Sequence, residues 1–181
     1  MRRVVVSTYV TLDGVMEAPE KWELWNEEEM EKYAWEQLLA SDALLMGRKI
    51  YEGFAAAWPS RGGEFADRMN SLPKYVVSTT LEAVEWSNTS VIRDDVPNEV
   101  AKLKQQSGRD ILMYGSSELM HTLMQHDLID EYRFWVNPIV LGSGKRLFPE
   151  GSSRSEFRLV GTTTFSTGVV ILAYQLAGKE R

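Results

Sequence analysis

The sequence predicts an α/β protein with a mostly parallel central sheet, helices on the faces of that sheet, and antiparallel strands added at the carboxyl end. Two observations predict this class. Four short, almost continuously apolar runs are typical of parallel strands covered on both faces. Longer amphipathic stretches alternate with them, as expected where helices cross over a parallel sheet. The four runs are residues 4–9, 43–46, 75–78 and 111–114.

Three amphipathic helices are predicted in order along the chain. The first covers residues 27–40, and the third follows the strand at residues 111–114. The second has signals at both ends, because Pro97 stands just inside its start and Gly108 just beyond its end. The apolar stripes are Met30, Tyr33, Ala34 and Leu38; Val96, Val100 and Leu103; and Leu119, Met120, Leu123 and Met124.

The last third of the chain has a different pattern. Residues 131–139, 157–161 and 169–176 are strand-like, and no helix is expected between the last two runs, which predicts an antiparallel addition to the sheet. No linker is long enough to separate domains, so residues 1–181 are expected to form one domain.

Composition excludes several classes of function. The formal net charge is −6 and there is no basic stripe, which argues against nucleic acid as a partner. The chain has no cysteine, and only His121 and His126 could supply imidazole ligands, so no metal site is expected. No apolar run approaches the ~20 residues of a membrane span, and polar residues interrupt the first strand too early for a signal peptide. We therefore expect a cytoplasmic protein without membrane contacts.

A turn between a strand and a helix is the sharpest local signal. The apolar run at residues 111–114 leads directly through Gly115, Ser116 and Ser117 into the third helix. Glycine lets a backbone approach a ligand closely, and free amides at a helix start form an anion site, to which serine hydroxyls can add donors. The alternative is that Ser116 or Ser117 only caps the helix.

Two other strand ends carry polar residues. Gly47, Arg48 and Lys49 follow one strand, and Ser78 and Thr79 follow another. The carboxyl ends of parallel strands are where open α/β sheets bind ligands, so these cations and hydroxyls are candidates for phosphate contacts. The alternatives are a solvated charge pair and a polar turn. A G-x-G-x-x-G fingerprint and a Walker loop are both absent.

Segments along nearly the whole chain resemble the dihydrofolate reductase-like superfamily. Within it, they are similar to the reductase domain of bacterial riboflavin biosynthesis and its stand-alone relatives. The most specific segment is YGSSELMHTLMQHDLIDEYRFWVNPIVLGSGKRLF, at residues 114–148. The other segments are STYVTLDGVM (7–16), LLMGRKIYEGF (44–54) and PKYVVSTT (73–80).

The resemblance implies a site for a reduced nicotinamide dinucleotide and favours NADPH over NADH. The adenosine-side phosphates would contact Gly47, Arg48 and Lys49, and the 2′-phosphate would contact Ser78 and Thr79. The residues of the pyrophosphate turn would be Gly115, Ser116, Ser117 and Leu119. The residues bordering the nicotinamide would be Leu12, Asp13 and Gly14. The residues lining the substrate side would be Val136, Asn137 and Pro138.

Two further side chains are candidates near the substrate. Asp13 is the candidate for a polar contact or a proton relay, with a simple Asp-Gly turn as the alternative. Trp22 is a candidate for stacking on a planar substrate, and packing against the core is its alternative.

The chain departs from dihydrofolate reductases at two places. Those enzymes have a threonine where Ile50 stands, so one phosphate hydroxyl is missing and Arg48 and Lys49 would have to compensate. They also place a buried carboxylate early in the first helix. The cluster in that region, residues 27–29, consists of three glutamates and is typical of a solvated helix start, which does not favour folate reduction.

The leading hypothesis is hydride transfer from reduced nicotinamide to an imine or carbonyl carbon of a small, planar heterocyclic substrate. One alternative is the riboflavin-pathway reductase of 5-amino-6-(5-phosphoribosylamino)uracil, which needs a basic pocket, with Arg61, Arg68 and Arg154 as scattered candidates. Dihydrofolate reductase and a non-catalytic nucleotide-binding protein are the others. A homodimer is expected, because residues 131–142 are more apolar than a solvent-facing strand and the riboflavin reductase relatives commonly pair.

Overall fold

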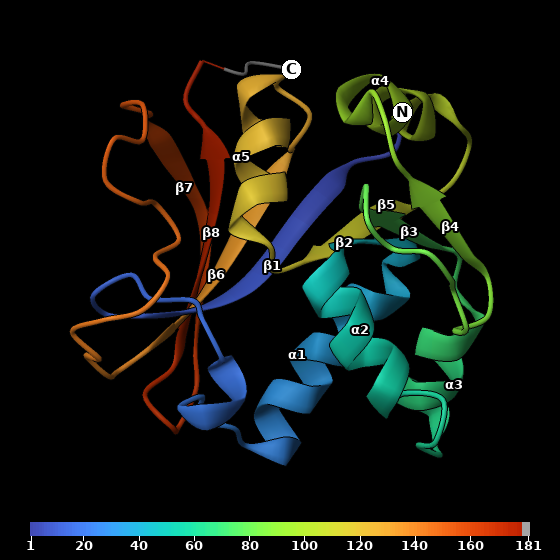
Figure 1. The fold of residues 1–181 in the computed structure, drawn as a ribbon. Coiled ribbons are helices and arrows are strands. Elements are labelled where there is room, and N and C mark those ends of the chain that lie inside the picture. Colours follow the sequence, from blue (N-terminus) through green and yellow to red (C-terminus); the bar gives the residue numbers. More distant parts are fainter. Residues whose placement is uncertain (179–181) are drawn as a thin grey trace.

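The computed structural model describes residues 1–178 and shows one eight-stranded sheet in the order β4-β3-β2-β5-β1-β6-β8-β7 (Figure 1). Residues 179–181 of the expected domain lie outside the described part. Strands β4 to β6 in that order are parallel, and β8 and β7 are antiparallel. The strands are β1 (Val4–Thr11), β2 (Ser41–Gly47), β3 (Lys74–Val77), β4 (Thr89–Ile92), β5 (Asp110–Tyr114), β6 (Glu131–Asn137), β7 (Phe157–Thr164) and β8 (Val170–Leu176).

Helices cover both faces of the parallel part of the sheet (Figure 1). One face carries α4 and α5, and the other carries α1, α2 and α3. The helices are α1 (Glu27–Leu39), α2 (Arg48–Ala57), α3 (Glu64–Ser71), α4 (Val96–Gln105) and α5 (Ser117–Gln125), with a short 3-10 helix at Pro19–Lys21. No helix in the described range combines the length and apolar character needed to cross a bilayer.

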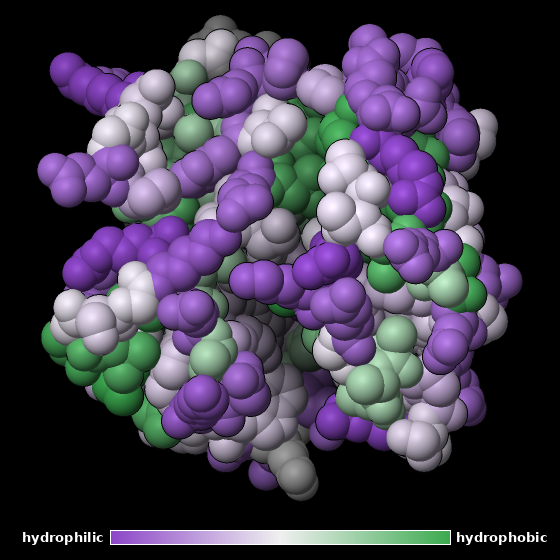
Figure 2. Space-filling view, viewed as in Figure 1, coloured by the Kyte–Doolittle hydropathy of each residue, from purple (hydrophilic) through white to green (hydrophobic). Residues whose placement is uncertain are grey.

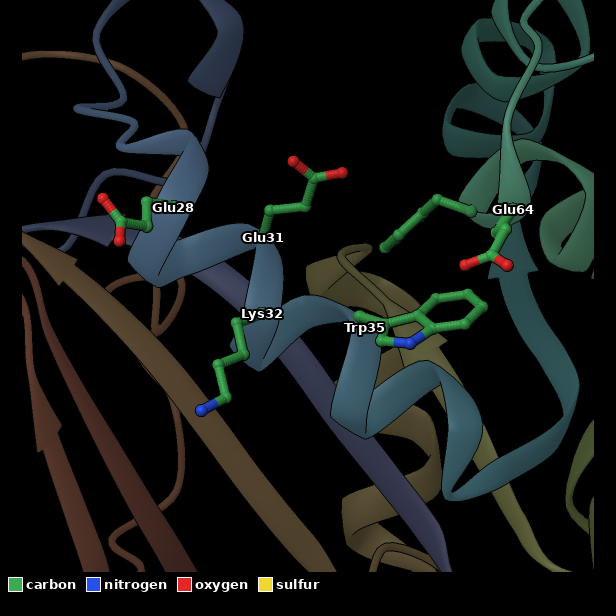
Figure 3. Close-up of a pocket in the computed structure, with 6 residues that line it drawn as sticks. Glu28, Glu31, Lys32, Trp35 and Glu64 are labelled. Atoms are coloured by element: carbon green, nitrogen blue, oxygen red, sulfur yellow. The ribbon is translucent and has the colours of Figure 1, made fainter.

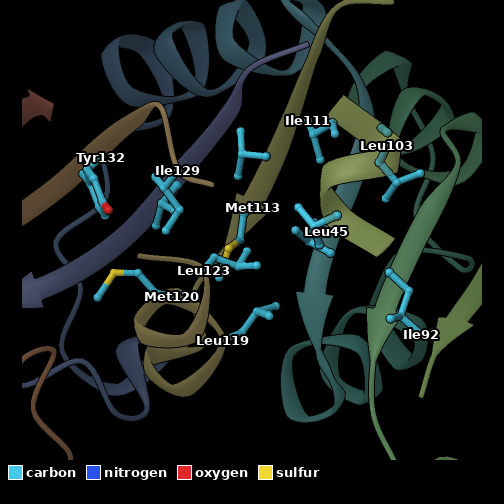
Figure 4. Packing of buried hydrophobic residues seen from close by; sticks show 14 of the residues in the cluster. Leu45, Ile92, Leu103, Ile111, Met113, Leu119, Met120, Leu123, Ile129 and Tyr132 are labelled. Carbon is cyan, nitrogen blue, oxygen red and sulfur yellow. The ribbon is translucent and has the colours of Figure 1, made fainter. Parts of the chain in front are cut away.

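The central strands are buried on both faces. Figure 4 shows Ile111 and Met113 of β5 and Leu45 of β2 packed against the apolar stripes of α4 and α5. On the opposite face, Leu112 belongs to a second cluster with side chains of α1, α2 and α3. Burial from both sides explains why these strands are almost continuously apolar.

The predicted fold class is confirmed, and three elements escaped prediction. The strand β4 pairs only with β3 at the edge of the sheet and lies in a polar stretch, so it has little apolar signal. The helices α2 and α3 are short and follow polar strand ends or loops, which we had considered for chemistry rather than for periodicity.

Element boundaries differ from the predicted ones for local reasons. β6 ends at Asn137 because Pro138 has no N–H to continue the ladder. β7 continues past Gly161, where the register with β8 shifts. At the start of α1, the side chain of Asn26 accepts a hydrogen bond from the N–H of Glu29, and Glu28 and Glu29 are exposed, as expected of a solvated helix start.

A buried ion pair joins α4 to the sheet. Lys104 and Asp130 pair with side chains only 5% and 4% exposed. Asp130 also accepts a hydrogen bond from the N–H of Val4 at 2.8 Å, and Lys104 donates to the carbonyl of Leu128 at 2.9 Å. The pair therefore connects α4 to the start of β1 and to the loop before β6.

We expect Asp130→Ala to lower the free energy of unfolding by about 3–5 kcal/mol, because it leaves the Lys104 ammonium buried without its carboxylate. Urea denaturation followed by tryptophan fluorescence measures this change. The matched control is Lys102→Ala on the same helix, which removes an exposed ion pair with Glu99 and should change stability little. Equal effects of the two substitutions would contradict the structural role of the buried pair.

Candidate functional site

Two strand-to-helix turns meet at the carboxyl edge of the sheet (Figure 1). β2 leads into α2 on one face, and its neighbour β5 leads into α5 on the other. Neighbouring parallel strands whose helices leave toward opposite faces open a crevice, and such crevices bind ligands in α/β proteins. The two turns are in close contact, because a Cβ added at Gly47 would lie 2.8 Å from the Oγ of Ser116.

The first amides of α5 are directed toward the crevice without a partner. Gly115 and Ser116 have φ angles of 53° and 57°, in the left-handed region, and they turn the chain sharply from strand to helix. The first backbone bond runs from the N–H of Met120 to the carbonyl of Ser116, and the Ser116 side chain does not cap the helix. Among the described groups, none accepts from the N–H groups of residues 117–119, so the serines are not acting as caps and the turn is open to an anion.

The start of α2 adds a cation to the same crevice. Gly47 precedes the helix and makes no side-chain cap. The guanidinium of Arg48 donates to the hydroxyl of Thr80 at 2.9 Å and lies 3.5 Å from the carboxylate of Glu52. Arg48 is therefore held across the end of β3, with its side chain still partly open to solvent.

The turn after β3 is shaped by a serine. The hydroxyl oxygen of Ser78 accepts hydrogen bonds from the N–H groups of Thr80 and Leu81, at 3.2 and 3.0 Å. Ser78 is buried, whereas Thr79 is exposed. The hydroxyl that contacts Arg48 is thus that of Thr80, one position beyond the predicted pair.

Two lysines approach the N-terminal end of α5. Lys145 donates to the carboxylate of Glu118 at 2.8 Å. This hydrogen bond and the charges of Lys145 and Lys49 lower the pKa of Glu118. The loop containing Lys145 therefore reaches the crevice, although its sequence indicated only a loop near a ligand.

The residue that replaces the family threonine has a packing role. A Cβ added at Gly115 would lie 3.0 Å from the Cδ1 of Ile50, so this side chain supports the turn from the α2 side. Leu119 is buried in the core below α5, which leaves only its backbone N–H available to a ligand.

Asp13 connects two loops beside β1. Its carboxylate accepts hydrogen bonds from the hydroxyl of Thr11 at 2.6 Å, and from the N–H groups of Gly142 and Leu141 at 2.8 and 3.2 Å. The Thr11 hydroxyl and then the Gly142 amide lower the pKa of Asp13 to about 2. Asp13 is therefore ionised at neutral pH, which corrects its consideration as a proton donor and matches the turn alternative.

The flanking residues Leu12 and Gly14 hold the same loops together. Leu12 donates its N–H to the carbonyl of Ile139, and the carbonyl of Gly14 accepts from Leu147. The Leu12 side chain itself is 63% exposed, so it can contact a bound molecule.

The predicted substrate-side residues divide into different roles. Asn137 is fully buried, and its side chain accepts from the N–H of Leu24 at 2.8 Å and donates to the carbonyl of Trp135. Trp22 is 8% exposed and donates its ring N–H to the carbonyl of Glu17, which matches the packing alternative rather than stacking on a substrate. Both residues hold the segment before α1 in place. Val136 is half-buried and Pro138 is exposed.

A cavity opens between α1 and α3 on the face opposite α5 (Figure 3). Its volume is about 440 Å³, large enough for a small molecule. Its lining comprises Glu28, Glu31, Lys32, Trp35, Glu64 and Phe65. The space-filling view in Figure 2 shows a hollow near the middle of the molecule, rimmed mostly by hydrophilic side chains.

Sequence reasoning missed two tyrosines deep on the α1 face. Ser7 of β1 pairs with Tyr114 of β5, so Tyr9, two residues further along β1, lies on the same face as Tyr114. The alternation of side chains along parallel strands could have indicated this pair. The sequence alone does not specify which strands are neighbours, and that knowledge is needed to bring them together.

The strand order, the crevice and the two turns define a dihydrofolate reductase-like protein. A solved structure of dihydrofolate reductase from Enterococcus faecalis, complexed with NADP(H), has the same fold, with a TM-score of 0.65 at 14% identity over 97% of this chain and 96% of that one. The chain belongs to the RibD C-terminal domain family, whose sequence profile matches residues 2–171.

Two further comparisons agree with this membership. The protein YyaP of Bacillus subtilis (strain 168) is 32% identical over 182 residues, which cover 98% of this chain and 96% of YyaP. A structure from Shewanella sp. PV-4, assigned to riboflavin biosynthesis, matches with a TM-score of 0.77 at 20% identity, covering 100% of both chains. At these identities the structural matches establish the fold.

The hydrogen bonds to Asp13 give a measurable pH dependence. Its pKa is lowered, so the connection between its two loops is complete above the ordinary value of 3.8 and is lost as the pH falls toward about 2. We expect the amide signal of Gly142 to titrate with a midpoint of about 2 in a pH series of ¹H–¹⁵N spectra. The Asp13→Asn variant, which cannot ionise, should lack this titration. A midpoint near 4 would contradict the geometry.

Proposed function

We propose that the protein is an NADPH-dependent reductase that transfers a hydride to an imine or carbonyl carbon of a small, planar heterocycle. One observation carries the proposal: two helix starts without side-chain caps meet at Gly47 and Ser116, and Arg48 lies at the edge of the same crevice. Paired helix starts and a cation fit a ligand with several phosphates. Family membership supports the reductase class.

The residues present fit such a dinucleotide. The free amides of residues 117–119, with Gly115 and Ser116, would hold the pyrophosphate. Gly47, Arg48 and Lys49, with the turn of Ser78 and Thr79, would hold the adenosine-side phosphates. The guanidinium of Arg48, positioned by Thr80, supports NADPH over NADH, because a 2′-phosphate would gain a charge-assisted hydrogen bond. Leu12, Asp13 and Gly14 would border the nicotinamide.

The reaction needs two electrons, which the reduced nicotinamide supplies as hydride when bound, and one proton. The hydride forms a C–H bond at the acceptor carbon, the π electrons move to the attached nitrogen or oxygen, and that atom takes the proton. Asp13 is ionised at neutral pH and so does not supply the proton. Water entering from the cavity is the proposed source, and the residues of this chain contribute binding and orientation.

The alternatives differ in the charge of their substrates. A phosphorylated substrate of the riboflavin-pathway type needs a basic pocket, and the three arginines considered for it lie apart. Arg61 stacks on Trp58, Arg68 donates to the carbonyl of Ser41, and Arg154 pairs with Glu156. Folate reduction stays an alternative within the same fold, and a non-catalytic nucleotide-binding protein would bind the cofactor without oxidising it.

We also propose a homodimer in the cytoplasm, where a reductase of this kind has access to NADPH. The support for a dimer is an apolar area that α5 does not cover, on the same face of β6, β8 and β7. Phe134, Leu172 and Thr162 are paired across these strands, and Leu159, which pairs with Tyr174, is 49% exposed. Exposed apolar areas of this kind are typical of protein interfaces.

Gly47→Ala is expected to weaken NADPH binding by about 10- to 100-fold, because the new methyl group must displace Ser116 from the turn that receives the phosphates. Titration of NADPH and NADH against tryptophan fluorescence measures this effect. The wild-type protein should prefer NADPH. Cofactor absorbance is then followed with candidate pterins, pyrimidines and quinones.

The matched control for this experiment is Gly53→Ala in α2, where nothing lies within 4 Å of the added Cβ and affinity should not change. Absence of binding by either dinucleotide would overturn the proposed function. Binding without oxidation by any substrate would favour the non-catalytic alternative.

Sedimentation velocity tests the dimer, and the wild-type protein is expected to sediment as one. Leu159→Glu should convert it to a monomer, because it places a charge in the apolar area. Arg158→Glu, at the exposed neighbouring position that faces the other side of β7, is the control and should remain dimeric. A wild-type protein that is monomeric at high concentration would refute the dimer.

A further inference from the structure

Three polar groups next to the crevice have no hydrogen-bond partner within residues 1–178. They are the hydroxyls of Tyr9 and Tyr114 and the carboxylate of Glu23, and none of the hydrogen bonds between described groups involves these atoms. Burial raises the pKa of Tyr9, and the charge of Glu23 and the proximity of Tyr114 raise it further, so the three groups are close enough to interact. Unpaired polar groups in a half-buried location are costly unless a ligand or water completes them.

The two tyrosine hydroxyls remain accessible. Among the described side chains, the fully enclosed polar atoms without a partner are the Nε of Arg68 and the hydroxyl of Tyr132. The hydroxyls of Tyr9 and Tyr114 are not in that class, so they face the cleft rather than the closed core. Tyr114 directly precedes Gly115, which places this cluster beside the turn proposed for the cofactor.

Glu23 is held in place by its neighbours. On one side, Trp22 donates its ring N–H to the carbonyl of Glu17 at 2.8 Å. On the other side, Leu24 donates its N–H to the buried side chain of Asn137 at 2.8 Å. The segment is therefore anchored on both sides of Glu23, while its carboxylate stays untethered. Burial and then the charge of Glu20 raise the pKa of Glu23, and a positive or N–H-bearing ligand would relieve both effects.

Aromatic rings connect this cluster to the cavity of Figure 3. Phe54 contacts Tyr114 and then Trp58, with ring centres 5.4 and 6.3 Å apart. Trp58 stacks on Phe65 at 5.3 Å, and Phe65 lines the cavity together with Trp35. A planar ligand would therefore meet aromatic surface from the mouth of the cavity to the tyrosines.

The mouth of the cavity is predominantly negative. Its lining includes Glu28, Glu31 and Glu64, against the single ammonium of Lys32. The cation nearest to the aromatic path is Arg61, whose guanidinium is centred 4.7 Å over the ring of Trp58. An anionic substrate would therefore enter against three carboxylates and meet a fourth at Glu23, which is unfavourable in a partly desolvated site.

We propose that Glu23, with Tyr9 and Tyr114, is the specificity-determining end of the substrate pocket. The pocket takes planar heterocycles that present N–H donors and carry no negative charge. This assignment rests on the proposed reductase function for its location beside the cofactor. It distinguishes the chain from enzymes whose substrates carry a phosphate.

Binding of two planar probes of similar size tests the proposal on the unaltered protein. The first is 2-aminobenzimidazole, which has adjacent N–H donors, and the second is 2-naphthoate, which is an anion. Both are titrated by calorimetry, with and without NADPH. We expect 2-aminobenzimidazole to bind at least about 10-fold more tightly, and uridine to bind more tightly than uridine 5′-monophosphate. Equal or reversed preferences would overturn the proposal.

Substitutions then locate the selectivity. Glu23→Gln should weaken 2-aminobenzimidazole by about 10- to 100-fold, because a charge-assisted hydrogen bond is lost. Tyr9→Phe and Tyr114→Phe should each weaken it several-fold. The matched control is Glu20→Gln, which removes an exposed charge from the same segment and should not weaken binding. An unchanged affinity in Glu23→Gln would overturn the assignment.

Two measurements separate the possible failures. The Glu23 side chain makes no hydrogen bond to the described protein, so thermal unfolding of Glu23→Gln should match wild type; the tyrosine variants supply independent evidence if it does not. NADPH affinity, measured in the same series, tests the proposed function. Normal NADPH binding with no probe selectivity would refute only the substrate assignment. Probe selectivity without NADPH binding would support the pocket and refute the reductase.

Discussion

The close contact between Gly47 and Ser116 is the constraint on which the site depends. It forms where neighbouring strands send their helices to opposite faces of the sheet, so it exists only because β2 and β5 are adjacent. Any side chain at Gly47 would separate the two turns. The free amides of α5 and the guanidinium of Arg48 then reach the same crevice without a cofactor to bring them together.

The fold class could be predicted because burial dominates the central strands. Strands such as β5, with Ile111, Leu112 and Met113 fully buried, need apolar residues on both faces, and that requirement is visible in one dimension. Edge elements lack this requirement. β4 pairs on one side only and carries no comparable signal, and α2 begins directly at a strand end that attracted attention for its charges.

The candidate site was predictable where function depends on consecutive backbone atoms. The turns at residues 47–49 and 115–117 are contiguous, so their residue types indicate their geometry. Side chains that meet across the sheet are different. Thr80 replaces Thr79 as the partner of Arg48 because the Ser78 hydroxyl caps the turn, and Asp13 proves to be bound by amides 128 and 129 positions away. Such partners follow from tertiary contacts.

The two ends of the site have opposite electrostatic character. Around the crevice, Arg48, Lys49 and Lys145 surround helix starts that favour anions, whereas the aromatic path toward α1 ends in carboxylates. A negatively charged dinucleotide and an N–H-bearing heterocycle would therefore each be repelled from the place of the other. This separation would orient both ligands with their reacting atoms near Tyr114, the residue where β5 meets the cofactor turn. The neutral phenol of Tyr114 lies at the boundary, which requires neither charge.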